Sequence, residues 1–318
     1  MADIKTVATR ASYGEALVEL GNKRDDFIVM DADLAAATQT GKFKAAFPDR
    51  FYDCGIAEQN MLGIAAGIAA TGKRVFVSSF AMFAAGRAFE QIRNSICYPQ
   101  LPVIIGATHA GISVGEDGAT HQCLEDIALM RTLPGMTVIN PADDIEAKKA
   151  VFAAIEHEGP VYLRFGRYAV PVIFDETYDF KIGKASILRD GSDVTVIATG
   201  LMVSEALKAY DILKSEGISA RIINMATIKP LDTEAVLAAA KDTGAIVTAE
   251  EHSVIGGLGS AVSETLCETF PVPVLKLGVY DRFGYSGPAG KLLDEFGLRA
   301  NDIAEKAKTA IQLKRKNA

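Results

Sequence analysis

The stretch VFVSSFAMFAAGRAFEQIRNSICYPQLPVIIGA, residues 75–107, contains the pattern that decides the fold of this chain. It begins and ends with short apolar runs, Val75–Ser79 and Val103–Ala107, which do not alternate regularly with polar residues. Such runs are typical of strands that are buried on both faces of a sheet. The longer segment between them has room for a helix, so the stretch predicts a strand–helix–strand unit of a parallel sheet.

Similar runs recur through most of the chain, separated by longer segments with helical periodicity. The further strand candidates are Phe27–Met30, Thr137–Ile139, Val161–Phe165, Val194–Thr199, Arg221–Met225, Ala245–Ala249 and Val274–Leu277. Asp143 followed by Glu146 predicts a capping box, and Gly217 predicts the end of a later helix. The sequence therefore predicts an α/β fold with two doubly wound domains, a parallel-sheet domain followed by a smaller α/β domain.

The expected domain boundary lies between Pro171 and Gly191, where charges are scattered and no helical period is present. The dipeptide Asp190-Gly191 closes this stretch with a turn signal. We place one domain at residues 1–175, a linker at 176–190 and the second domain at 191–318, which are ordinary domain sizes.

Composition excludes several classes of function. The formal net charge of the 318 residues is -7, which argues against a nucleic-acid surface. The run from Ile56 to Ala70 is interrupted by polar residues and is too short to span a membrane. The amino terminus has no apolar core, so it does not resemble a secretion signal. We expect a cytoplasmic protein that binds neither nucleic acid nor membrane.

Glu58 stands at the predicted start of a helix that is rich in small residues, after Gly55-Ile56-Ala57. A carboxylate in the first turn of a helix often serves only to complement the helix dipole. The alternative is a carboxylate at the edge of an apolar pocket, where partial desolvation raises its pKa and lets it share a proton with a ligand nitrogen.

Phe80 and Phe83 follow the strand that ends at Ser79 and lie on one side of a helical turn. Most such pairs are core residues. These two, however, stand just beyond the carboxyl end of a buried strand, where open α/β sheets bind their ligands. Two aromatic faces in that place suit a flat heterocycle.

The segment THAGISVGEDGATHQ, residues 108–122, contains two of the four histidines in the chain, His109 and His121. Its glycines predict a loop after the strand Val103–Ala107, and such loops carry function more often than packing. A metal site would need further ligands such as a third histidine or a pair of cysteines, and this segment contains neither. Groups that hold substrate hydroxyls and move protons fit these residues better.

Arginines complete the set of candidates. Arg164 and Arg167 flank Phe165-Gly166 at the end of another predicted strand, and Arg10 precedes the first helix. Single arginines are usually surface residues, but a guanidinium near the strand ends of a doubly wound fold can hold a phosphate through two hydrogen bonds.

In their order along the chain, these segments resemble the pyrimidine-binding and C-terminal domains of the transketolase family. The resemblance covers essentially the whole chain and rests on Asp31–Leu34, Gly55–Asn60, Ser79–Phe83 and His109–Gln122. It implies a C-terminal subunit of a two-chain transketolase, which transfers a two-carbon ketol unit from a ketose phosphate to an aldose phosphate.

The resemblance also implies roles for single residues. Glu58 matches the glutamate that hydrogen-bonds the aminopyrimidine of thiamine diphosphate, and it is a catalytic candidate together with His109 and His121. Phe80 and Phe83 match aromatic residues around that ring, and Asp33 matches an aspartate near the cofactor. The matches for contacts with the sugar and its phosphate are His109, Asp117, His121, Arg10 and Arg164.

Two positions depart from the family pattern. Ala37 replaces a phosphate-contacting serine, which leaves the identity of the phosphorylated substrate open. Gly86 replaces a third aromatic residue near the cofactor, which indicates a different aminopyrimidine pocket.

The chain contains no Gly-Asp-Gly segment of the kind with which full-length family members bind the metal and the diphosphate. We therefore expect a separate N-terminal subunit to supply that domain, with Mg²⁺ or Ca²⁺ bound there and no metal ligand on this chain. Because active sites of this family lie between domains of different chains, an α2β2 assembly is expected.

Three other interpretations remain open at this point. Within the superfamily, the chain can act like a 1-deoxyxylulose-5-phosphate synthase or a 2-oxo acid dehydrogenase β subunit. Gly256-Gly257-Leu258-Gly259 weakly suggests dinucleotide binding, although the spacing is not G-x-G-x-x-G. The third interpretation is a catalytically silent subunit that only interacts with other chains.

Overall fold

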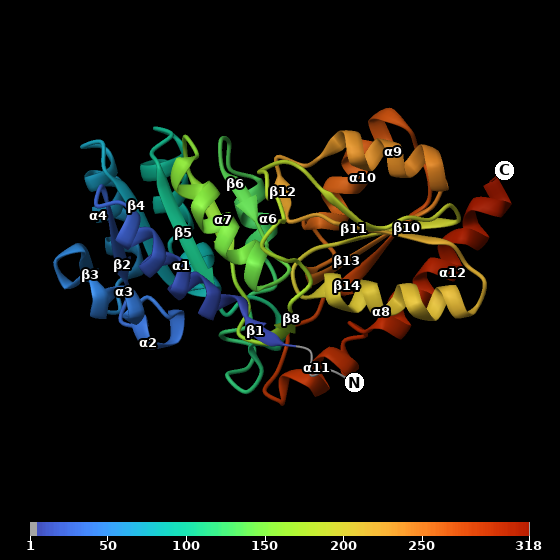
Figure 1. The fold of residues 1–318 in the computed structure, drawn as a ribbon, viewed down its shortest axis with the longest axis horizontal. Coiled ribbons are helices and arrows are strands. Elements are labelled where there is room, and N and C mark those ends of the chain that lie inside the picture. The colour runs from blue at the N-terminus through green and yellow to red at the C-terminus, as the bar shows by residue number, and fades with distance from the viewer. Residues whose placement is uncertain (1–4, 318) are drawn as a thin grey trace.

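The computed structural model describes residues 5–317 and contains, besides a small two-stranded sheet, two large sheets, each covered by helices on both faces. Figure 1 shows the first domain at the left, in blue and green, and the second domain at the right, in yellow to red. The predicted α/β fold with two doubly wound domains is therefore confirmed.

The first domain is built on a seven-stranded sheet with the order β12-β6-β7-β5-β4-β2-β3. All neighbouring strands are parallel except β12, which pairs antiparallel with β6. The strands are β2 (Phe27–Asp31), β3 (Phe51–Asp53), β4 (Arg74–Phe80), β5 (Val103–Thr108), β6 (Thr137–Ile139), β7 (Val161–Arg164) and β12 (Thr227–Lys229).

Alternate strand residues of this sheet face two different cores, because side chains along a strand point to opposite faces. Phe76 and Ile104 pack in the core under α1 (Thr9–Lys23), α3 (Gly41–Ala46) and α7 (Asp144–Glu156). Val77 and Ile105 pack in the other core. The helical elements over that core are α4 (Glu58–Ala69), α6 (Asp126–Arg131) and the π-helical turns η2 (Met82–Arg87) and η3 (Ile92–Cys97).

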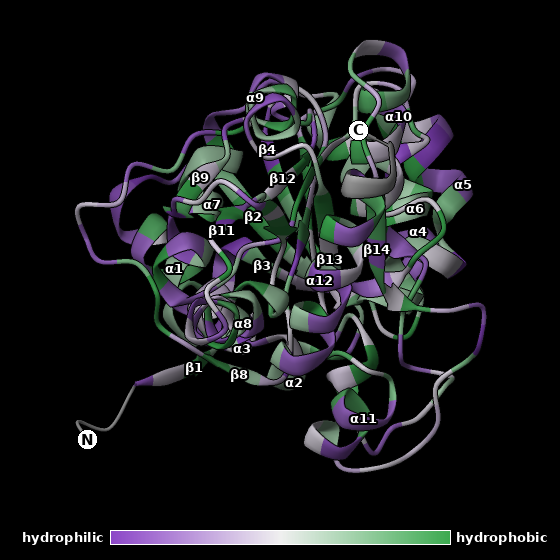
Figure 2. Ribbon diagram, turned by 90° about the vertical axis from the view of Figure 1, so that its right-hand side faces the viewer, coloured by the Kyte–Doolittle hydropathy of each residue, from purple (hydrophilic) through white to green (hydrophobic). Residues whose placement is uncertain are grey.

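The second domain has a five-stranded sheet with the order β14-β13-β10-β11-β9, parallel except at β9. Its strands are β9 (Ser186–Arg189), β10 (Val194–Ala198), β11 (Ala220–Asn224), β13 (Ile246–Ser253) and β14 (Val274–Val279). The helices α8 (Met202–Ser215), α11 (Ala289–Glu295) and α12 (Ala300–Asn317) cover one face, and α9 (Thr233–Thr243) and α10 (Leu258–Thr269) cover the other. Figure 2 shows these helices around the apolar strands.

The two domains share secondary structure across their boundary. The segment 176–190, expected to be a linker, contains β9, which joins the second sheet. In the other direction, β12 follows β11 in the chain but pairs with β6 of the first sheet. A small ladder between β1 (Thr6–Ala8) and β8 (Ala169–Pro171) joins the two ends of the first domain. The domains are thus interlocked at the boundary and not joined by a free linker.

The expected helix signals are present at α7 and α8. Asp143 is the N-cap of α7, and its side chain accepts a hydrogen bond of 2.8 Å from the backbone N–H of Glu146. Gly217 follows α8 with a φ of 77°, a left-handed conformation that glycine adopts readily. None of the helices within residues 5–317 combines the length and the apolar character needed to cross a bilayer.

Candidate active site

The carboxyl ends of β4 and β5 bring Phe80 and His109 together. The two strands are parallel, and their register pairs Phe80 with Thr108. His109, the residue after Thr108, therefore lies beside the phenyl ring of Phe80. The rings of Phe80 and His109 stack with centroids 3.8 Å apart. His109 has a φ of 56°, which turns the chain sharply out of the strand.

Phe83 and His121 complete a group of four rings, which we call the aromatic group: Phe80, Phe83, His109 and His121. Phe83 stacks on Phe80 at 5.8 Å, and His121 meets the edge of Phe83 at 5.2 Å. The structure therefore brings together four of the residues that the sequence singled out, at the strand edge where α/β sheets bind ligands.

His109 is held as a neutral imidazole with a defined tautomer. Its Nε2 lies 3.0 Å from Nη1 of Arg10. A guanidinium group can only donate hydrogen bonds, so Nε2 is the unprotonated nitrogen that accepts this one. Nδ1 then donates to Oγ1 of Thr108 at 2.9 Å. Burial lowers the pKa of His109 to about 3, with further lowering by the positive charge of Arg10.

Two guanidinium groups lie beside this histidine. Nη1 of Arg10 donates to the carbonyl of Ala37 at 2.8 Å, and Arg167 donates to the carbonyl of Val114 and, at 3.2 Å, to Oε2 of Glu116. Burial lowers the pKa of Arg10, and the nearby positive charge of Arg167 lowers it further. Two cationic groups held this close together form a place for an anion.

Glu58 is the first residue of α4, and only 2% of its side chain is exposed. Both carboxylate oxygens accept hydrogen bonds from Nη1 of Arg87, at 2.9 and 2.8 Å. The guanidinium of Arg87 also lies over the ring of Phe83, 4.6 Å from its centroid. A nitrogen donor therefore occupies the space between the buried carboxylate and the aromatic group. Arg87 was not among the predicted residues, although it stands four positions after Phe83.

Asp33 is exposed and adopts a φ of 62°, and its backbone N–H donates to Oδ1 of Asp53 at 3.1 Å. The neighbouring Asp31 is fully buried and accepts hydrogen bonds from the hydroxyls of Thr38 and Thr40, at 2.7 and 2.8 Å. Burial raises the pKa of Asp31 to about 6. Asp31, the first residue of the Asp31–Leu34 motif, thus fixes the 31–40 turn, whose Ala37 carbonyl accepts a hydrogen bond from Arg10.

Asp117 lies on the exposed part of the 108–122 segment, and its negative charge offsets part of the lowering of the Arg10 pKa by burial and by Arg167. Arg164 is in a different place from the one expected. It is 3% exposed, and its Nε donates to Oδ2 of Asp126 at 2.8 Å, within a buried ion pair. The structure therefore does not bring Arg164 to the aromatic group, because Asp126 already neutralises its charge in the interior.

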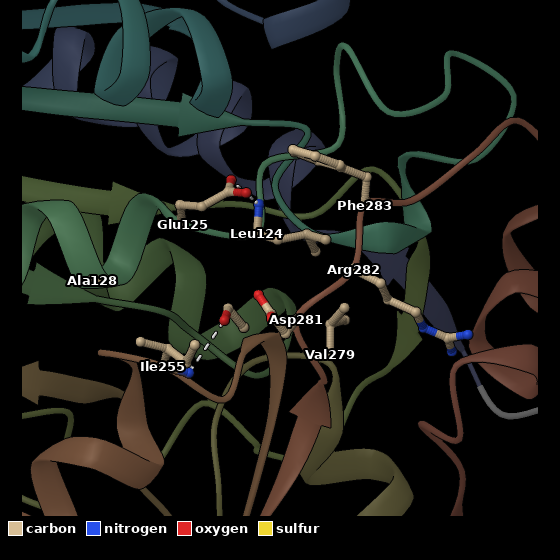
Figure 3. A pocket seen from close by; sticks show the side chains of 9 residues that line it. Leu124, Glu125, Ala128, Ile255, Val279, Asp281, Arg282 and Phe283 are labelled. Atoms are coloured by element: carbon tan, nitrogen blue, oxygen red, sulfur yellow. Dashed lines mark hydrogen bonds between the residues drawn. The ribbon is translucent and has the colours of Figure 1, made fainter.

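The structure also contains a cavity of about 370 Å³, which lies between the start of α6 and the segment 279–283. Figure 3 shows Leu124, Ile255 and Val279 around it, while the guanidinium of Arg282 points away. No residue of the aromatic group lines this cavity. Among residues 5–317, no cluster of three or more histidine, cysteine, aspartate or glutamate side chains is arranged to hold a metal ion.

Comparisons with known proteins match both domains. Residues 5–172 match the model of the transketolase pyrimidine-binding domain, and residues 183–303 match that of the transketolase C-terminal domain. A putative transketolase C-terminal section of Methanocaldococcus jannaschii is 52% identical over 300 residues, which cover 93% of this chain and 94% of that protein.

Two further similarities concern proteins with divided chains. A subunit of a 6-deoxy-6-sulfo-D-fructose transketolase from a Clostridium species is 45% identical over 298 residues, covering 94% of this chain and 92% of the relative. A solved structure described as a split gene transketolase, inactive beta4 tetramer, superposes with a TM-score of 0.90 at 51% identity, covering 98% of this chain and 100% of that one. Enzymes of this family depend on thiamine diphosphate. The chain belongs to the transketolase family, as the C-terminal subunit of a split member, with a pyrimidine-binding domain followed by a transketolase C-terminal domain.

Proposed function

We propose that this chain, assembled with a separate N-terminal subunit, is a thiamine-diphosphate-dependent transketolase that moves a two-carbon ketol unit from a ketose phosphate to an aldose phosphate. The observation that carries the proposal is the aromatic group, which stands between a buried carboxylate and two guanidinium groups. When bound, thiamine diphosphate supplies the nucleophilic carbon and the electron sink for carbon–carbon cleavage.

The residues around the aromatic group fit the aminopyrimidine. Glu58 already accepts N–H donors from Arg87 beside the face of Phe83, so its carboxylate can accept one from a ring nitrogen in the same place. Phe80 and Phe83 offer stacked faces for a flat ring. Asp33 is proposed to lie near the cofactor. At Gly86, the terminal methyl group of Met82 occupies the space that a side chain would take.

The sugar and its phosphate are proposed to lie on the other side of the aromatic group. His109 is unprotonated at neutral pH, and its Nε2, which accepts a hydrogen bond from Arg10 in this structure, is proposed to accept one from a substrate hydroxyl in its place. His121 and Asp117 are proposed to contact sugar hydroxyls. We assign the phosphate to Arg10 and Arg167, and not to Arg164, because the charge of Arg164 is engaged by Asp126.

The outer face of α4 supports assembly with further chains. Ile56 is 78% exposed and Tyr52 is 51% exposed, and both lie in the stretch just before Glu58, the first residue of α4. Gly63 and Gly67 face open space, because a side-chain carbon at either position meets no atom within 4 Å. An apolar surface with small residues beside the carboxylate suits another subunit. We propose an α2β2 assembly in which the partner chain holds Mg²⁺ or Ca²⁺ and the diphosphate.

The proposal is tested by mixing this chain with its N-terminal partner chain, thiamine diphosphate and Mg²⁺, and following ketol transfer and pyruvate decarboxylation in parallel. We expect ketol transfer from the mixture, and none from either chain alone. Pyruvate decarboxylation without ketol transfer would favour the synthase-like or dehydrogenase-like alternative. Full ketol transfer by this chain alone would contradict the two-subunit proposal.

A further inference from the structure

The segment between His109 and Gln122, called the substrate loop from here on, is held in place by the second domain. Its own regular structure is one short 3-10 turn, Ile112–Val114. Gly115 and Gly118 adopt positive φ angles of 85° and 75°, so the backbone turns sharply after the 3-10 turn. A loop of this kind depends on contacts outside itself for a single conformation.

Glu251 makes the most buried of these contacts. It lies on β13 of the second domain and is 4% exposed. Its Oε1 accepts a hydrogen bond of 2.5 Å from the backbone N–H of Ser113, across the domain boundary. The carboxylate lies so close to the loop that a side-chain carbon added at Gly111 would be 2.3 Å from its carboxyl carbon.

Arg167 is bound to the same turn. It donates to the carbonyl of Val114, and the residue that precedes Val114 is Ser113, whose N–H is held by Glu251. The turn is therefore fixed between a carboxylate of the second domain and a guanidinium of the proposed phosphate site. Displacement of the turn would move the carbonyl that orients Arg167.

A second set of contacts closes the far end of the substrate loop. The side-chain amide of Gln122 donates to the carbonyl of Gly115 within the loop and, at 3.1 Å, to the carbonyl of Tyr285 in the second domain. Gly284 lies against Gln122, and Ser286 lies against Gly118. Both ends of the loop thus rest on the second domain.

A buried carboxylate such as that of Glu251 is an unfavourable choice if the side chain only fills space. Burial raises the pKa of its carboxyl group, because the charged form loses its hydration. The nearby Arg164 pairs with Asp126 through Nε and donates to the backbone carbonyl of Glu251 at 3.0 Å. An apolar side chain of similar size would fill the same space without the desolvation cost.

We infer that Glu251 is a positioning residue of the proposed transketolase reaction: through the Ser113 N–H it fixes the turn that orients Arg167, and so sets the affinity for the phosphorylated donor. The inference rests on the proposed function for its kinetic part only. The second domain thereby takes part in substrate recognition without contacting the substrate.

The structural part is tested on this chain alone by amide hydrogen–deuterium exchange. Glu251→Ala is expected to speed exchange at residues 111–118 by about 10- to 100-fold, the range of a lost hydrogen bond to a charged group. Glu251→Gln keeps an acceptor oxygen and is expected to retain most of the protection. Glu205→Ala is the matched control, because Glu205 is a buried carboxylate of the same domain that accepts from the backbone N–H of Ala300, away from the loop.

The kinetic part uses the assembled enzyme. Glu251→Ala is expected to raise KM for the phosphorylated donor by about tenfold and to change kcat much less, with rescue by Glu251→Gln. If Glu251→Ala is poorly folded, Glu251→Asp, which shortens the side chain, takes its place in both measurements. Unchanged exchange at 111–118, or an equal KM change in Glu205→Ala, would overturn the inference. Absence of ketol transfer in the unmodified enzyme would instead overturn the proposed function, and the exchange result would still stand.

Discussion

The two domains have the same doubly wound design but use the carboxyl ends of their strands differently. In the first domain, Phe80 is the last residue of β4 and His109 directly follows β5, and their rings form part of the aromatic group. In the second domain, the end of β13 carries three consecutive polar residues, Glu250, Glu251 and His252, and all three are buried.

Each of these three residues binds backbone. Glu250 accepts from the N–H groups of Leu258 and Gly259 at the start of α10, and Glu251 accepts from Ser113. His252 accepts from the N–H of Ala128 at 3.3 Å and donates to the carbonyl of Ser253 at 2.7 Å. One set of strand ends therefore gathers aromatic rings and an imidazole bonded only to side chains, whereas the polar side chains of the other set bind backbone groups.

The sharpest way to break this comparison is to exchange the two histidines for glutamine. His109→Gln is expected to lower kcat for ketol transfer by about 100- to 10,000-fold, the usual contribution of a general acid–base group, with little change in thermal stability. His252→Gln is expected to lower the melting temperature while the folded enzyme keeps its kcat. Steady-state kinetics and calorimetry on both variants decide the matter. The reverse pattern would mean that the roles of the two strand ends are misassigned.

The arginines offer the next comparison. Arg164→Met leaves the carboxylate of Asp126 buried without its partner, and breaking such a pair costs about 3–5 kcal/mol of unfolding free energy. Denaturant unfolding measures this loss. Arg221→Met is the control, since Arg221 pairs with exposed carboxylates of Asp190 and Asp242, and a much smaller loss is expected there. Equal losses in the two variants would contradict a structural role for Arg164.

Arg167→Ala and Arg10→Ala test the proposed phosphate site. Each removes a charged donor, so KM for a phosphorylated donor sugar is expected to rise by about 10- to 100-fold. KM for the same sugar without phosphate is expected to change little. Comparison of the two sugars in one assay separates phosphate binding from general damage, and an equal rise for both sugars would argue against these arginines as the anion site.

The smallest effect is on the pH dependence of stability. The pKa of His109 is lowered to about 3 in the folded chain, whereas an unfolded histidine titrates near 6.5. Between these values the unfolded chain binds a proton that the folded chain does not, so this residue makes the unfolding free energy fall as pH decreases below about 6.5, by about 1.4 kcal/mol per pH unit.

His109→Gln removes this contribution. The difference in unfolding free energy between His109→Gln and the unmodified chain is therefore expected to change by about 1.4 kcal/mol between pH 6 and pH 5 and to stay constant above pH 7.5. Urea unfolding at a series of pH values measures it. A difference that is independent of pH would show that His109 is not held neutral by burial.

The strands with continuous apolar runs could be predicted from the sequence, including the edge strand β14, and the shorter strands could not. The nine runs of apolar residues all became strands, because burial on both faces demands continuous apolar character. The strands that escaped prediction, β1, β3, β8, β9 and β12, have three or four residues each. Their pairing is decided by neighbours distant in the sequence, as when β12 crosses to the sheet of the first domain.

In the candidate site, too, some residues could be predicted from the sequence and others could not. Phe80, Phe83, His109 and His121 could be found because each follows a recognisable strand or lies in an unusual loop. Arg87 escaped because its partner Glu58 is 29 residues away, and the choice between Arg164 and Arg167 depends on Asp126, which carries no local signal. Partners that are distant in the sequence decide whether an arginine is paired in the interior, as Arg164 is, and a single sequence does not contain that information.

The central claim is that Glu58 of the first domain controls proton movement on thiamine diphosphate. The most direct measurement is the rate of hydrogen–deuterium exchange at C2 of the thiazolium ring in the assembled enzyme, followed by NMR after rapid quenching. We expect Glu58→Gln to slow this exchange by at least about 100-fold and the exposed control Glu19→Gln to leave it unchanged. An unchanged exchange rate in Glu58→Gln, with the cofactor bound, would show that Glu58 does not control this proton.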